Sequence, residues 1–352
     1  MKKIISLSFA VLLAHSSFGQ NATTTPVGAM TYSFPATSGA TTTTTLSIPL
    51  LRPSVFVGVV GSLTTNSSIT VTGAGWTAGA YATPAQPYFV RFTSGNQAGR
   101  TIKVTGNTAD TLTLDTSDNS TQPTPLDLAG WAVVPGTDSF ELFPGYTFAI
   151  LFGDNTAGNL VAFKTSNNIK NADTVQIFNG SVWDLYYFDT TSNCWRSKTS
   201  ANNVNDMVIY PNMGIMISRK ANNPVPAEIV VLGSVPSIAP LTKTTGGSST
   251  RYVSSGFPVD MTLGSLNLTG WVKAASLKSN PGPDTVLIYN GTSWDIYFQS
   301  SVAPYNWLAK NNPVGNASTT AIPAGSIIGI VKKASVSGAS SFLKTSTMPY
   351  SF

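Results

Sequence analysis

Hydrophobic residues along the chain occur in short runs and not at a sustained helical spacing. The runs are rich in Val, Ile, Thr, Phe and Tyr, and Gly, Asn, Pro or Ser closes them. Short runs bounded by turn residues are typical of β-strands. Residues 126–134 are one place where a helical turn fits the pattern. We therefore expect an all-β protein of several modules, each a β-sandwich or a small barrel.

The clearest strand pattern is "YFVRFTSGNQAGRTIKVTGNTADTLTLD", which runs from Tyr88 to Asp115. It predicts three strands, separated by one turn over residues 94–99 and another at residues 106–107. Strands that follow one another this closely form a β-meander. We assign the meander to a first module over residues 52–143.

One hairpin pattern occurs twice. The stretch "DTVQIFNGSVWDLYYF" begins at Asp173, and "DTVLIYNGTSWDIYFQ" begins 111 residues later, at Asp284. Weaker matches flank both copies, and a period this long indicates a duplicated domain. We therefore expect an internal duplication in the C-terminal two-thirds of the chain, with repeat A over residues 144–241 and repeat B over residues 251–352. The Gly/Ser/Thr-rich residues 242–250 are expected to be a linker.

Each hairpin has Asn-Gly in its turn and Trp-Asp just after it. Asn179-Gly180 and Asn290-Gly291 predict a two-residue type I′ turn, in which both residues need φ > 0. With that turn, one face of each hairpin is rich in aromatic residues, and we expect it to be core, anchored by the Trp residues. The residues of this face are Phe178, Trp183, Leu185 and Tyr187 in the first copy, and Tyr289, Trp294, Ile296 and Phe298 in the second.

The opposite face of each hairpin has an Asp-x-Tyr pair beside aliphatic residues. The pairs are Asp184/Tyr186 and Asp295/Tyr297. One interpretation is a structural carboxylate that accepts hydrogen bonds from backbone amides of a neighbouring loop. The other is a saccharide site, in which the Tyr ring stacks on a sugar and the Asp accepts hydrogen bonds from hydroxyl groups. A register shift of one residue would exchange the two faces.

The N-terminal residues have the pattern of an export signal. Lys2 and Lys3 precede an apolar stretch from Ile4 to Ala14, and residues 17–19 have the small residues of a cleavage site. The apolar stretch is too short to span a bilayer. We assign residues 1–19 as a signal peptide. We expect the mature protein at the cell surface or outside the cell, with the periplasm as the alternative, and without a transmembrane span.

The Thr-rich residues 20–51 lie outside any complete module. Met30–Phe34 and Leu46–Leu51 are strand-like, whereas the Thr-rich tract between them has too little apolar content to form a core. We expect this segment to add a strand to another sheet, and a sheet of a neighbouring subunit is one candidate acceptor.

The scarcity of His and Cys excludes several kinds of chemistry. His15, the only His, lies in the signal segment, and Cys194 is the only Cys. The mature chain therefore has no Ser-His-Asp or Cys-His nucleophile system, no His- or Cys-rich zinc site and no intrachain disulfide. We expect Cys194 to be a small buried residue; a reactive thiol or an intermolecular disulfide is the alternative.

Charged residues are few and scattered. Without Lys2 and Lys3, 18 basic residues face 15 acidic ones, a net charge of about +3. No Lys/Arg run marks a nucleic-acid partner. The acidic residues form no compact pair of the kind that a glycosidase needs. Asp115 and Asp118 have a spacing that suits a surface Ca²⁺, but an Asx turn explains it as well. We expect no catalytic residues, no metal site and no cofactor.

Several stretches carry a family resemblance. They are "IPLLRPSVFVGVV", the meander, "DSFELFPGYTFAILFG" and the paired hairpin modules. Together they resemble a family of exported, uncharacterised β-rich proteins from Verrucomicrobia-like bacteria, although the short Asn-Gly turn departs from the longer, Tyr-rich hairpin of that family. The meander alone is similar to β-modules of phage tails and surface fibres. The resemblance implies an exported envelope or extracellular protein and supplies no catalytic residues.

These observations favour an exported, non-enzymatic structural or adhesive protein that associates with itself or with other surface proteins. Strand addition by residues 20–51 would be the mechanism of assembly. The alternative is a carbohydrate-binding protein, with glycans as partners of the paired Asp-x-Tyr sites. A polysaccharide-active hydrolase is a third class, and it requires a carboxylate pair that the sequence does not locate.

Overall fold

The protein is nearly all β, as expected from the sequence. The computed structural model describes residues 26–115, 128–244, 249–268, 271–276, 282–302, 307–333, 341–344 and 348–351. Within these ranges, helix is confined to one turn of α-helix, α1 (Phe148–Phe152), and one 3-10 turn, η1 (Thr156–Gly158). Neither has the length that a membrane-crossing helix requires. The expected signal peptide and Asp118 lie outside the described residues.

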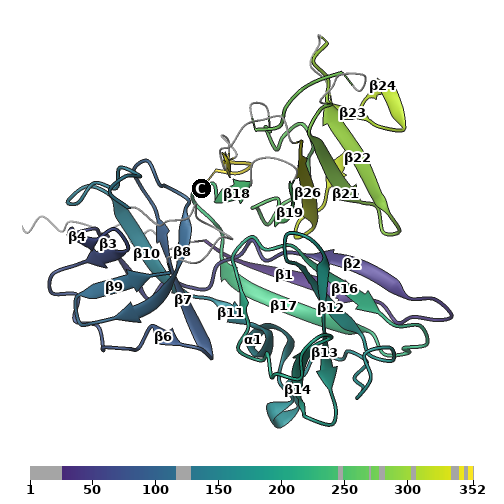
Figure 1. The fold of residues 1–352 in the computed structure, drawn as a ribbon, viewed down its shortest axis with the longest axis horizontal. Helices are drawn as coiled ribbons and strands as arrows, with labels where there is room; N and C mark the ends of the chain where they lie inside the picture. The colour runs from purple at the N-terminus through teal and green to yellow at the C-terminus, as the bar shows by residue number, and fades with distance from the viewer. Residues whose placement is uncertain are drawn as a thin grey trace, which may run out of the picture.

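The first module is an eight-stranded antiparallel sheet, shown in blue in Figure 1. Its strands are β3 (Phe56–Val59), β4 (Ser62–Thr65), β5 (Ser68–Thr70), β6 (Ala82–Thr83), β7 (Gln86–Phe92), β8 (Thr101–Asn107), β9 (Thr111–Leu114) and β10 (Ser139–Pro144). They follow the order β3-β10-β7-β8-β9-β5-β4, and β6 pairs with β7. The predicted meander is therefore present as β7, β8 and β9.

A second body, which we call unit A, combines residues 26–51 with residues 145–235. Its strands are β1 (Val27–Phe34), β2 (Thr42–Leu46), β11 (Tyr146–Thr147), β12 (Thr174–Phe178), β13 (Trp183–Asp189), β14 (Cys194–Ser197), β15 (Val208–Ile209), β16 (Ile215–Arg219) and β17 (Ala227–Ser234). A five-stranded sheet has the order β14-β13-β12-β16-β2, and two-stranded pairs join β1 to β17 and β11 to β15.

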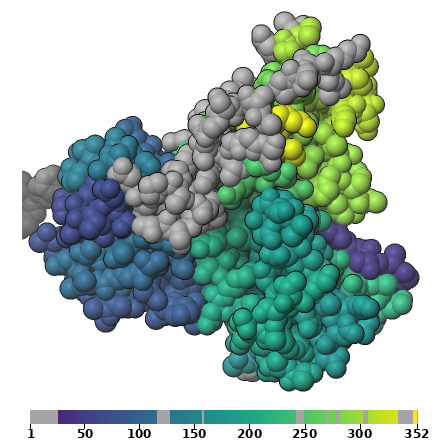
Figure 2. Space-filling view, in the orientation of Figure 1, coloured from purple at the N-terminus to yellow at the C-terminus, as the bar shows by residue number. Residues whose placement is uncertain are grey.

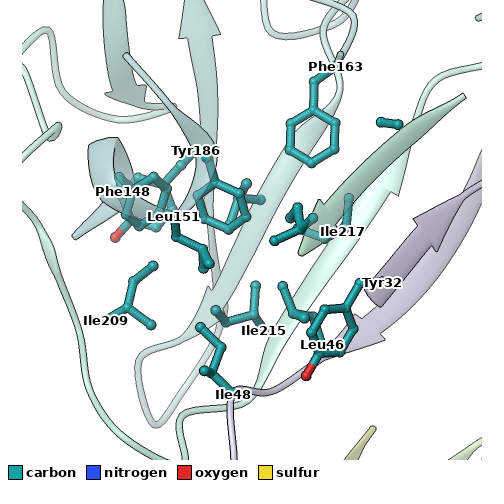
Figure 3. Packing of buried hydrophobic residues seen from close by; sticks show 14 of the residues in the cluster. Tyr32, Leu46, Ile48, Phe148, Leu151, Phe163, Tyr186, Ile209, Ile215 and Ile217 are labelled. Atoms are coloured by element: carbon teal, nitrogen blue, oxygen red, sulfur yellow. The ribbon is translucent and has the colours of Figure 1, made fainter. Parts of the chain in front are cut away.

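The N-terminal segment completes unit A within its own chain. β1 pairs with β17 along its whole length, and β2 pairs with β16 at the edge of the five-stranded sheet. Phe34 and Leu46 from this segment are fully buried, and Figure 3 shows Tyr32 and Leu46 beside Ile215. The N-terminal segment thus adds strands to a sheet, as expected, and that sheet belongs to the same chain. For residues 26–51, the placement outside any module was wrong, because their partners lie far along the chain, beyond the eight-stranded sheet.

The C-terminal body, unit B, extends from residue 241 to residue 351. Its strands are β18 (Leu241–Thr244), β19 (Ser249–Ser254), β20 (Met261–Thr262), β21 (Thr285–Tyr289), β22 (Trp294–Gln299), β23 (Trp307–Ala309), β24 (Asn312–Asn316), β25 (Ala321–Ile322), β26 (Ile327–Lys332) and β27 (Ser341–Lys344). The described residues of the expected linker, 242–244 and 249–250, lie in strands of this unit, since β18 pairs with β27 and β19 pairs with β26.

Units A and B share one pairing scheme. The sheet order β2-β16-β12-β13-β14 of unit A matches β19-β26-β21-β22-β23 of unit B, which adds β24 at its edge. The pair β1·β17 corresponds to β18·β27, and β11·β15 corresponds to β20·β25. In unit B the first two strands are contiguous with the rest, whereas in unit A the eight-stranded module lies between them and β11.

Direct backbone contacts join the three bodies, which Figure 2 shows in contact with one another. The Ser47 amide of unit A donates to the Gly325 carbonyl of unit B at 2.8 Å, and the Ser254 amide donates back to Asn212 at 3.0 Å. The Leu241 amide donates to Gly99 of the eight-stranded module at 3.0 Å. Backbone hydrogen bonds therefore connect the three bodies to one another.

Candidate functional site

The two hairpins that the sequence emphasises have the same register. In unit A, Val175 pairs with Tyr186 and Phe178 with Trp183, so that four residues, 179–182, connect the paired positions. The pairs of unit B, 111 residues later, are Val286 with Tyr297 and Tyr289 with Trp294. The predicted type I′ turn is wrong in both units. A positive φ occurs at Gly180 and Gly291, but at neither of the Asn residues before them.

The Asn side chain organises each turn by hydrogen bonding. Asn179 Oδ1 accepts from the backbone amides of Ser181 and Val182, each at 3.0 Å. Its Nδ2 donates to the carboxylate of Asp184 at 3.2 Å. Asn290 makes the same contacts, with Thr292 at 3.0 Å, Ser293 at 2.8 Å and Asp295 at 3.2 Å. Each Asp thus accepts a hydrogen bond from the Asn of its own turn, and within the described residues no backbone amide of a neighbouring loop donates to it.

The faces of the two hairpins differ from those we expected, although Phe298, one of the residues expected in the core, is buried at 2% exposed. Tyr186 is 9% exposed and Tyr297 8% exposed, and both belong to the cores of their units. Figure 3 shows Tyr186 among the packed side chains beside Phe148. A buried ring has no free face for a sugar, so the Asp-x-Tyr pairs are not saccharide sites of the expected form. The aliphatic residues of β12 and β21 face the core. The aromatic face of the unit A hairpin packs against Tyr252 of unit B, and Trp294 of the unit B hairpin packs against the same Tyr252.

That aromatic face forms a continuous row of rings between units A and B. Tyr252 of β19 lies in the middle, with its ring centroid 4.6 Å from that of Trp183 and 4.9 Å from that of Trp294. Phe178 extends the row beyond Trp183 at 5.5 Å, and Tyr289 extends it beyond Trp294 at 5.2 Å. All five side chains, which we call the aromatic row, are half-buried. Burial raises the pKa of Tyr252 above its ordinary value.

A surface hollow of about 370 Å³ lies at the unit B end of the aromatic row. Its lining residues are Trp294, Asp295 and Ile296 of β22, with Lys310 and Asn311 from the turn between β23 and β24. The Lys310 amide donates to the Ile296 carbonyl at 2.8 Å, which fixes the turn against β22. The residues that line the hollow thus include one with an indole ring, one with a carboxylate, one with an ammonium group and one with an amide. Sequence reasoning named Asp295 but missed Lys310 and Asn311, since no motif distinguishes them.

Each unit also contains a buried ion pair at the start of its hairpin. In unit B, Lys332 Nζ lies 2.8 Å from Asp284 Oδ2, and the two side chains are 8% and 0% exposed. The Asp284 carboxylate also accepts from the backbone amides of Lys273 and Lys333, each at 2.8 Å. Unit A repeats this arrangement with Asp173, Arg219 and the amides of Lys164 and Lys220. These carboxylates join three chain segments, and with their hydrogen-bonding capacity engaged they are structural in role.

The remaining candidate chemistry is sparse in the part of the chain that the structure describes. Cys194 is buried, as expected, and its Sγ lies 3.2 Å from Ser192 Oγ. Within the described ranges, no three His, Cys, Asp or Glu side chains come together as a metal site would require. The hollow beside Trp294 is therefore the strongest candidate for a functional site among the described residues.

Among the described residues, the fold is that of an all-β protein of three connected bodies, with a surface hollow beside Trp294 as its candidate site. Comparison with protein-family models, with curated proteins and with solved structures finds no match to this chain.

Proposed function

We propose that the chain is an exported, non-enzymatic structural or adhesive protein of the cell surface or the extracellular space. The signal pattern of residues 1–19 supports export. One observation supports a role in assembly: residues 26–51 supply two strands to unit A from across an inserted module. Such a segment is able to complete the same unit in a second copy, which links copies without any new contact surface.

The energetics of this exchange follow from the buried side chains of the segment. Phe34, Leu46 and Leu50 are each at most 1% exposed, and burial of such a side chain contributes roughly 1.5–3 kcal/mol. Release of the segment from a folded unit A is therefore slow. Closure in cis and closure in trans make the same contacts, so the protein concentration during folding decides between them. We expect exchange to take place as the chain folds.

The shared pairing scheme of units A and B supports a further part of the proposal. We infer that the two units are copies of one domain, and that the eight-stranded module is an insertion into the first copy. The repeat would then begin with β1 and β18, and not near residues 144 and 251. A duplicated unit with an exchangeable first pair of strands suits a protein that assembles, because each copy offers the same type of joint.

A pair of cysteines across the β1·β17 pair tests assembly by strand exchange. Ser33 and Glu228 are opposite each other, and both are exposed, so Ser33→Cys with Glu228→Cys places two thiols at the joint. The variant is prepared in a Cys194→Ser background, refolded over a range of protein concentrations and then oxidised. Strand exchange predicts disulfide-linked dimers and larger species on non-reducing gels, in a fraction that rises with concentration.

The matched control places the two cysteines at Thr70 and Thr111, which are paired within the eight-stranded module. This pair is expected to form its disulfide within one chain at every concentration. If the Ser33/Glu228 pair also gives monomers alone at every concentration, assembly by strand exchange is refuted.

A further inference from the structure

The indole of Trp294 is a preformed aromatic surface at the rim of the hollow. Tyr252 and Tyr289 contact it at centroid distances of 4.9 and 5.2 Å, and the side chain is half-buried. Contacts on two sides restrict the rotamers of the indole before a ligand arrives, and this restriction lowers the entropy cost of binding. The hollow thus has one rigid apolar element, of the kind that anchors ligands in surface sites.

Three polar groups surround that indole. Asn290 holds Oδ1 of the Asp295 carboxylate at 3.2 Å, while Oδ2 makes no hydrogen bond with another described residue. Lys310 and Asn311 are exposed, and neither side chain hydrogen bonds to another residue in the described ranges. The carboxylate oxygen is an acceptor, the ammonium group is a donor, and the amide is both. The three residues line the same hollow, and their side chains have hydrogen-bonding capacity left for a ligand.

We propose that the hollow of Trp294, Asp295, Lys310 and Asn311 binds the pyranose ring of a neutral polysaccharide. One face of a pyranose presents C–H groups, which pack on an indole in the way that other apolar surfaces do. The edge of the ring presents hydroxyl groups, which donate to the Asp295 carboxylate and accept from the ammonium and amide groups of the neighbouring turn. Charge-assisted hydrogen bonds to these hydroxyl groups orient the ring.

The equivalent position in unit A is less suited to a ligand. Trp183, Asp184 and Lys198 correspond to the unit B residues, and the Lys198 amide donates to Leu185 at 2.8 Å as Lys310 does to Ile296. However, Asn179 Nδ2 is 3.2 Å from both oxygens of the Asp184 carboxylate. Thr199 replaces Asn311, and its hydroxyl lies 3.0 Å from that of Ser197. The acceptor and the second donor are therefore already engaged.

Affinity electrophoresis of the mature chain in native gels tests the proposal. The gels contain laminarin, xyloglucan, arabinoxylan, galactomannan or glycol chitin, and a gel without polysaccharide is the reference. We expect the wild-type chain to be retarded in at least one gel. Asp295→Asn, and Lys310→Ala with Asn311→Ala, are each expected to lower the association constant at least about tenfold, the equivalent of one charge-assisted hydrogen bond.

Lys198→Ala is the matched control, because it removes the equivalent exposed lysine from unit A, and its retardation is expected to equal that of the wild type. The altered side chains of unit B are half-buried or exposed, and an unchanged far-UV circular dichroism spectrum verifies that each variant folds. Binding at this hollow does not depend on strand exchange, so the two proposals fail separately. No retardation in any gel overturns the saccharide proposal. So does equal retardation of all variants, or a loss caused by Lys198→Ala.

Discussion

The buried ion pair of unit B gives the most direct test of what holds the hairpins in place. Asp284→Ala removes a fully buried carboxylate that accepts from Lys332 Nζ and from the backbone amides of Lys273 and Lys333. The substitution leaves an ammonium group inside the protein without its counterion. It also leaves two backbone N–H groups without their acceptor, at the point where three segments of unit B meet.

The expected loss of stability follows from the ammonium group and the two backbone N–H groups that are left without partners. Removal of one partner from a buried ion pair costs about 3–5 kcal/mol, and much of this cost is the penalty for the charge left behind. The Lys332 side chain is 8% exposed, so a small movement brings water to its ammonium group, which favours the lower end of that range. Because a domain is stable by only about 5–15 kcal/mol, a loss of about 3 kcal/mol is a large part of the stability of unit B.

Hydrogen exchange measured by mass spectrometry resolves this loss by unit. We expect the amides of β21, β22 and β26 to exchange roughly a hundredfold faster in Asp284→Ala, since every 1.4 kcal/mol is a factor of about ten. The amides of β7 and β8 in the eight-stranded module should be unchanged. Asp284→Ala combined with Lys332→Met removes both charges, and it is expected to be more stable than Asp284→Ala alone, because no unpaired charge remains.

Two results would refute this reasoning. One is a change below about 1 kcal/mol in the free energy of exchange of the β21 and β22 amides in Asp284→Ala. The contribution of the carboxylate would then be no larger than that of an ordinary surface ion pair. The other is a double variant less stable than Asp284→Ala, which would mean that the ammonium group is well solvated without its partner.

Three further predictions concern the hairpin turn of unit B, the aromatic row and the phenol of Tyr350. Asn290→Ala leaves two backbone amides of the turn without their acceptor and should lower the stability of unit B by about 1 kcal/mol in thermal unfolding, whereas Asn311→Ala should change it by less than about 0.5 kcal/mol. Tyr252→Ala should destabilise the chain by roughly 2 kcal/mol, about half the cost of removing a fully buried ring. It should also increase the radius of gyration in X-ray scattering, because units A and B separate. No increase would contradict the role of the aromatic row. Burial raises the pKa of Tyr350 to about 12, so its phenol ionises at lower pH in the unfolded chain than in the folded one. The free energy of unfolding, measured in urea, should therefore fall as the pH rises from about 10 towards 12. Tyr350→Phe should make this fall with pH smaller.

The strands of the meander and of the hairpins were predictable because their signals are local. Residues 88–115 alternate and turn within a short stretch, and neighbouring strands then pair with each other. The partners of residues 26–51 were not predictable in this way. Phe34 pairs with Ala227, and no local pattern records a contact across an inserted module. The same gap made residues 242–250 resemble a linker, although β18 and β19 are the counterparts of β1 and β2 in the pairing scheme.

The hairpin faces show why residue type alone misplaced the candidate site. A face with Phe178 and Trp183 is more apolar by composition than one with Asp184, and we therefore expected it to be core. The structure covers that face by Tyr252 from unit B, whereas Tyr186 occupies the core of unit A. Which of two apolar faces meets the core, and which meets another unit, depends on tertiary partners that lie far away in the sequence.

The position of the hollow follows from this arrangement of faces. Within the aromatic row, Trp294 is packed between Tyr252 and Tyr289, and it remains half-buried where it lines the hollow. Its two neighbours in the row restrict the rotation of the indole ring. Trp183 stands at the corresponding place in unit A, but the carboxylate beside it is engaged by Asn179 through both oxygens. Under the saccharide proposal, Oδ2 of Asp295, which has no hydrogen-bond partner among the described residues, is the acceptor that distinguishes the unit B position from its counterpart in unit A.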